Sequence, residues 1–60
     1  MSATTRKKAA LVARVYEESR VDHGIQQSKD MAAIVLRQTC PEMSRADAEE
    51  FVRLWWQGDI

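Results

Sequence analysis

The chain has few of the residues from which catalytic, metal-binding or cross-linked sites are built. Its 60 residues include one cysteine, one histidine, one proline and two glycines. One cysteine excludes a disulfide within the chain, and one cysteine with one histidine lacks the ligand number and spacing of a metal site. The two isolated glycines exclude a glycine-rich phosphate-binding loop. We therefore expect no catalysis, no cofactor and no bound metal.

Long apolar runs and an overall excess of one charge are also lacking. No stretch approaches the roughly 20 apolar residues that span a bilayer, and the N-terminal residues lack the pattern of a secretory signal. Together with the lone cysteine, which suits a reducing compartment, these features predict a cytoplasmic protein that has no membrane partner. The net charge is zero, so the domain as a whole lacks the basic surface typical of nucleic-acid binding.

What is present predicts a folded, all-α chain, because 45% of the residues are hydrophobic and 30% are charged. The helical spacing of the apolar residues and the capping signals between them predict three helices, at about residues 5–22, 28–39 and 44–57. We expect these helices to form a small three-helix bundle, as a single domain over residues 1–60.

Polar side chains ahead of each apolar stretch set where the helices begin, because their oxygens accept hydrogen bonds from the free N–H groups of a first turn. These predicted N-caps are Thr4 or Thr5, Ser28 and Ser44. Gly24 is expected to end the first helix in the left-handed conformation, and Gly58 is expected to end the third helix. Pro41 ends the second helix because it disfavours a helical backbone at Cys40.

The central helix has almost no polar face. The run from Met31 to Leu36 spreads apolar side chains over roughly 260° of the helix circumference at about 100° per residue. A helix that is apolar nearly all round is a buried one. We therefore expect other parts of the protein to cover this helix on two or more sides.

The third helix carries a broad apolar arc with two adjacent tryptophans. Trp55 and Trp56 diverge by about 100° on a helix, so both cannot point into one small core. One interpretation places Trp55 in the core and Trp56 over the rim of the same chain. The other places this surface in a protein interface, since tryptophan is enriched at interface hot spots. The predicted interface residues are Phe51, Leu54, Trp55 and Trp56.

The apolar arcs of three such helices exceed what three helices can bury among themselves, and a domain of this size rarely stabilises itself through one core alone. Both points predict association with a protein partner and self-association as a homo-oligomer, in the first instance a dimer. The expected function is that of a small protein-interaction module of the inhibitor or adaptor type.

The alternative function is a small helix-turn-helix-like DNA-binding regulator. Residues 1–20 carry five basic and two acidic side chains, whereas residues 41–60 carry two basic and five acidic ones. The basic residues early in the first helix oppose the helix dipole, which fits either a solvated helix end or an anionic partner. The residues expected to contact an anionic partner are Arg6, Lys7, Lys8 and Arg14.

Overall fold

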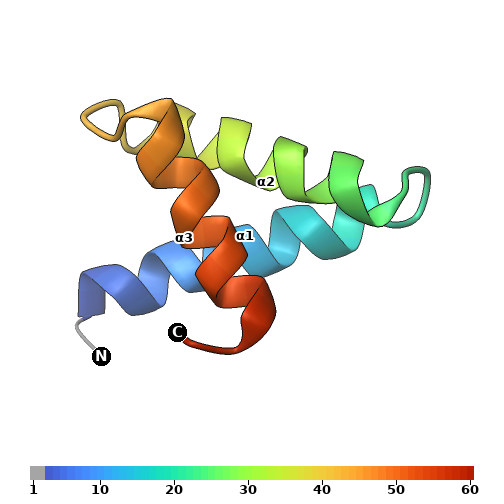
Figure 1. Ribbon diagram of the computed structural model, residues 1–60, viewed down its shortest axis with the longest axis horizontal. Coiled ribbons are helices and arrows are strands. Elements are labelled where there is room, and N and C mark those ends of the chain that lie inside the picture. The colour runs from blue at the N-terminus through green and yellow to red at the C-terminus, as the bar shows by residue number, and fades with distance from the viewer. Residues whose placement is uncertain (1–2) are drawn as a thin grey trace.

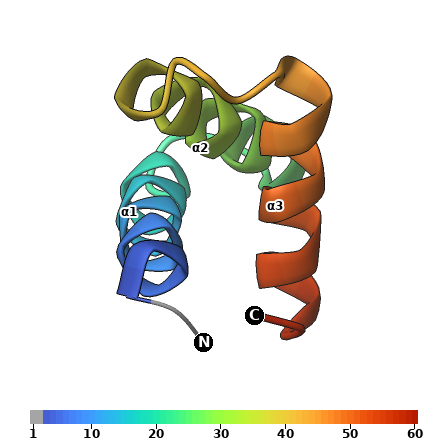
Figure 2. The ribbon, with the colours of Figure 1, turned by 90° about the vertical axis from the view of Figure 1, so that its left-hand side faces the viewer.

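The computed structural model describes residues 3–60 and contains three helices, α1 (Ala3–Ser19), α2 (Ile25–Thr39) and α3 (Arg45–Gln57), with no strand among the described residues. The predicted all-α three-helix fold is confirmed. In Figure 1, α1 and α2 lie side by side and run in opposite directions, while α3 crosses them steeply. The first turn of α1 and the last turn of α3 both lie at the foot of the molecule in Figure 2.

The centre of the fold is α2. It packs against α1 and against α3, whereas α1 and α3 share few contacts with each other. Figure 2 shows α1 and α3 descending from opposite sides of α2, so that the three helices form an arch with α2 at its top. The central position predicted for the second helix is therefore confirmed.

Small side chains let the helices approach α2 closely. The buried core consists of Val12 from α1, three residues of α2, and Ala48 and Val52 from α3. The three from α2 are Ala32, Ala33 and Leu36. Half-buried side chains pack around this core, namely Leu11, Val15, Cys40, Met43, Phe51 and Trp55.

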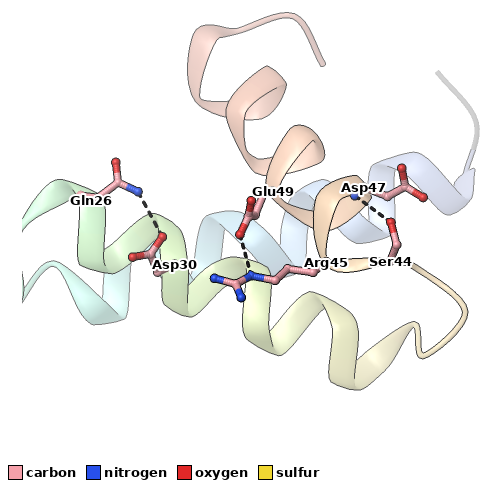
Figure 3. A network of polar contacts seen from close by, with 6 residues as sticks. All are labelled: Gln26, Asp30, Ser44, Arg45, Asp47 and Glu49. Carbon is pink, nitrogen blue, oxygen red and sulfur yellow. Dashed lines mark hydrogen bonds and ion pairs between the residues drawn. The ribbon is translucent and has the colours of Figure 1, made fainter.

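The predicted caps of α3 are confirmed. The hydroxyl oxygen of Ser44 accepts a hydrogen bond from the backbone N–H of Asp47 at 3.1 Å (Figure 3). At the other end Gly58 has φ +88°, the left-handed conformation, and its N–H donates to the carbonyls of Leu54 and Trp55. Such a backbone favours glycine, because a Cβ is strained there. The predicted end of the second helix, before Cys40 and Pro41, is also confirmed.

The predicted starts of the first and second helices are wrong. Because α1 begins at Ala3, Thr4 and Thr5 lie inside the helix. Likewise α2 begins at Ile25, three residues before Ser28, and its N-cap is Gly24 in an extended conformation with φ −73°. Ser28 is fully buried, and its Oγ has no hydrogen-bond partner.

The first helix also ends earlier than predicted, at Ser19. Gly24 does not adopt the left-handed conformation that was expected to end it. The chain turns instead over residues 20–24, where the N–H of His23 donates to the carbonyl of Ser19 at 2.9 Å. The guanidinium of Arg20 donates to the carbonyl of His23 at 2.7 Å, which holds the turn closed.

The contrast between the two serines predicts opposite effects of one substitution. Ser28→Ala removes a buried hydroxyl that lacks a partner, so it should raise the free energy of unfolding by about 1 kcal/mol. Ser44→Ala removes a helix cap and should lower it by about 1 kcal/mol. Urea unfolding followed by circular dichroism measures both. A destabilised Ser28→Ala protein would show that the hydroxyl has a favourable partner in solution.

Candidate protein-interaction surface

The face of α2 that points away from the core is exposed and carries large apolar side chains. Ile34 is 52% exposed and Met31 is 38% exposed, although both lie in the run that was expected to be covered on several sides. Ile34 is displaced from the buried Leu36 by roughly 160° around the helix, so it lies nearly opposite the core. The packing of α1 and α3 therefore covers two sides of α2 and leaves a third open.

We call this third side the outer α2 face. Its members share an exposed side chain and a position opposite the core, and they are Gln27, Asp30, Met31, Ile34, Arg37 and Gln38. The face is apolar at its centre, with amides and opposite charges around it. Scattered apolar residues on a surface are ordinary, but two adjacent ones in the middle of a packed helix form a small contact surface.

A groove runs beside this face, between α2 and α3. One part of it has a volume of about 440 Å³ and is lined by both helices; its lining consists of Asp30, Ala33, Ile34, Arg37, Arg45 and Glu49. A neighbouring part, of about 330 Å³, shares Asp30, Ala33 and Glu49 and extends to Lys29, Val52 and Arg53. The lining is thus mixed, with apolar side chains between charges of both signs.

Hydrogen bonds hold the charged side chains beside the groove in place. Arg45 Nε donates to Glu49 Oε1 at 3.0 Å within α3, and Gln26 Nε2 donates to Asp30 Oδ1 at 3.1 Å within α2 (Figure 3). No cation pairs with Asp30, and no carboxylate pairs with Arg37, among residues 3–60. Each of these two residues therefore offers an unpaired charge to a partner.

The arginines of α3 are largely engaged with glutamates of the same helix. Arg53 donates to both carboxylate oxygens of Glu50 as well as to Gln57. Hydrogen bonding from Arg53 lowers the pKa of the exposed Glu50 below its usual value, and Glu50 in turn raises the pKa of Arg53. Paired arginines offer little free positive charge, so α3 is poorly suited to contact phosphates in a DNA groove.

The four predicted interface residues of α3 lie in different surroundings. Phe51 and Trp55 are half-buried and pack against the core, and the ring of Trp55 meets that of Tyr16 edge-on, with centroids 5.4 Å apart. Leu54 is half-buried as well. Trp56 is 47% exposed, which makes it the member of the group with the most surface open to a partner.

Trp56 nevertheless contacts both other helices. Its Nε1 donates to the hydroxyl oxygen of Tyr16 at 3.3 Å, which links α3 to α1. The ammonium nitrogen of Lys29, in α2, lies 3.8 Å from the centroid of the Trp56 ring, a cation–π geometry. The structure thus has Trp56 at the rim of its own chain, as the first of the two interpretations expected, while part of its ring stays exposed.

The residues predicted to contact an anionic partner all lie on α1. Arg6 and Lys7 are exposed and Lys8 is half-buried, and none of the three makes an ion pair within the described part of the chain. Arg14 Nε lies 3.8 Å from Glu18 Oε1, so part of its charge is compensated. Three of the four residues predicted to meet an anionic partner therefore keep uncompensated charge.

No cluster of three or more His, Cys, Asp or Glu side chains suited to a metal ion occurs among residues 3–60. His23 and Cys40 lie beyond opposite ends of α2, and Cys40 packs against the core. Within the same range no helix is long and apolar enough to cross a membrane. Comparison with protein-family models, curated protein sequences and solved structures gives no match.

The residues that sequence reasoning missed are Met31 and Ile34, which were assigned to burial. A signal for their exposure was present in the polar residues around them. Gln27 and Gln38 lie seven residues before and four after Ile34, and so fall on its side of the helix. A fully buried helix does not carry amides and unpaired charges on one side.

The contacts of Trp56 predict a structural role for its side chain. Trp56→Ala should lower the free energy of unfolding by about 1–2 kcal/mol, because it removes the ring contact with Lys29 and the link to Tyr16. Tyr16→Phe removes that hydrogen bond while keeping the ring, so it should cost less. Urea unfolding compares the two variants. Unchanged stability of the Trp56→Ala protein would show that these contacts contribute nothing to the fold.

Proposed function

We propose that this chain is a small helical protein-interaction module, of the inhibitor or adaptor type, that binds a protein partner through the outer α2 face. One observation carries the proposal: Ile34 and Met31 stay exposed at the centre of a helix whose other sides are packed. The adjoining groove between α2 and α3 adds a recess in which a partner's side chains fit. Lys29, which lines one part of this groove, contacts the ring of the half-exposed Trp56.

The size of the domain supports association. A single core of this size supplies only a few kcal/mol, and the core here contains three alanines. Covering the outer α2 face would remove further apolar surface from water, at about 25 cal/mol per Å². This gain in free energy would favour self-association and binding to a different protein alike.

The proposal predicts that an acidic side chain at the centre of the face abolishes binding while the fold survives. Ile34→Glu places a charge where a partner must exclude water, yet Ile34 lies outside the core of the chain, so helicity should be unchanged. Val21→Glu is the matched control, since Val21 is 80% exposed and lies in the turn between α1 and α2.

Affinity capture from the native host, followed by stoichiometric reconstitution with the purified partner, makes the comparison. We expect a protein that binds the wild type and the Val21→Glu variant and is lost with Ile34→Glu. A partner that binds all three equally would contradict the role of the outer α2 face.

A second candidate function is DNA binding through α1. It is favoured by the uncompensated charges of Arg6, Lys7 and Lys8, and opposed by the paired arginines of α3. A DNA complex held by three cations should weaken with salt, with a slope of log K against log salt of about −3.

Electrophoretic mobility shift at low salt tests this candidate. DNA binding requires a shift that is lost when Arg6, Lys7 and Lys8 are all replaced by glutamine. No shift of duplex DNA at low salt is the result that the interaction-module proposal predicts.

A further inference from the structure

We infer that a second copy of this chain covers the outer α2 face, with the two α2 helices antiparallel and Asp30 of each copy paired with Arg37 of the other. The inference rests on the proposed function and names the occupant of its surface. It follows from the order of charges along the face, from the lack of an ion pair at either charge within residues 3–60, and from the symmetry of an antiparallel helix pair.

Asp30 and Arg37 lie on one edge of α2, two turns apart. Seven residues bring a helix back to within about 20° of the same direction and advance it by about 10 Å. Both side chains are exposed, and Ile34 lies between them along the helix. At that separation the two charges are too far apart to pair with each other within one chain.

A twofold axis perpendicular to α2, close to Ile34, makes this edge complementary to itself. In an isologous interface residue i of one copy meets residue j of the other, and j meets i. When the axis passes at the level between residues 33 and 34, Asp30 of each copy faces Arg37 of the other, which gives two such pairs. Two opposite-charge pairs then flank a central contact between the two Ile34 side chains.

The parallel arrangement and a uniformly charged partner fit less well. A parallel pair in register would set the Asp30 and Arg37 edge of one copy beside the Met31 edge of the other, so neither charge would meet an opposite charge. A partner of one charge would pair with one of these residues and repel the other. A second copy running antiparallel satisfies both.

The apolar side chains of the face and the groove beside it also fit a second copy of the chain. Met31 lies on the opposite edge of the face from Asp30 and would add to the central contact. The groove beside Ile34 offers room for side chains of the second copy. Since α2 has 15 residues, it is about 22 Å long, which gives a small interface and hence weak, concentration-dependent association.

Charge reversal separates this arrangement from others. Asp30→Arg gives a face with two positive charges, and Arg37→Asp gives one with two negative charges. Sedimentation velocity over a concentration series should show wild-type dimers and at least a tenfold rise in the dimer dissociation constant for each variant alone. Glu17→Arg and Arg6→Asp, which change the net charge by the same amounts on exposed positions of α1, should dimerise like the wild type.

Mixing the two reversed proteins is the decisive step. Asp30→Arg and Arg37→Asp chains should form a 1:1 heterodimer with wild-type affinity to within about threefold, because both charge pairs are restored. The double variant Asp30→Arg/Arg37→Asp should regain self-association for the same reason. Circular dichroism checks that every variant is helical.

Three results would overturn the inference: a wild-type chain that is monomeric to millimolar concentration, single variants that dimerise normally, or a mixture and double variant that stay monomeric. The capture experiment with Ile34→Glu separates this from the proposed function. If the wild-type chain captures a different protein that the Ile34→Glu variant does not bind, the proposed function holds even when no homodimer forms. If the chain forms the homodimer but captures no other protein, the inference of a second copy holds.

Discussion

The packing of α1 and α3 against two sides of α2 is the constraint on which the structure depends. Ala32 and Leu36 lie on the same side of α2 at a spacing of four residues, and Ala33 turns toward α3. The small side chains of the two alanines let the neighbouring helices pack onto α2, and Val12 and Val52 are buried in the same core. With α1 and α3 on these two sides, no helix covers the third side of α2, so the exposure of Ile34 follows from the same packing that makes the core.

The arch also leaves α1 and α3 with little direct contact, and aromatic side chains supply much of what joins them. Tyr16 meets the ring of Trp55 edge-on and accepts a hydrogen bond from Trp56. Lys29 connects α2 to these aromatic side chains, because its ammonium group lies over the face of the Trp56 ring. One of the two tryptophans thus extends the core and the other closes the rim, which is how adjacent residues that diverge by about 100° are both accommodated.

The fold was predictable from the sequence, while two features of the central helix were not. The apolar spacing, the Ser44 cap and the Gly58 end each indicated the helix that is observed. Ser28 misled because a serine ahead of an apolar run usually caps a helix, whereas its spacing of four from Ala32 places it in the core instead. Ile34 misled because an apolar arc of roughly 260° shows that a helix has surface to bury but not which neighbours cover it. That depends on how α1 and α3 cross α2, which only the three-dimensional structure shows.

We infer that the outer α2 face is open in the isolated chain and is the surface covered on association. Methyl NMR with a soluble paramagnetic agent measures this directly, through the relaxation of the Ile34, Leu36 and Val21 methyl groups in dilute and concentrated samples. We expect strong relaxation at Ile34 in dilute solution that falls as concentration rises, with Leu36 protected and Val21 accessible throughout. An Ile34 methyl group that is protected at the lowest concentration, or that stays fully accessible when the chain associates, would contradict it.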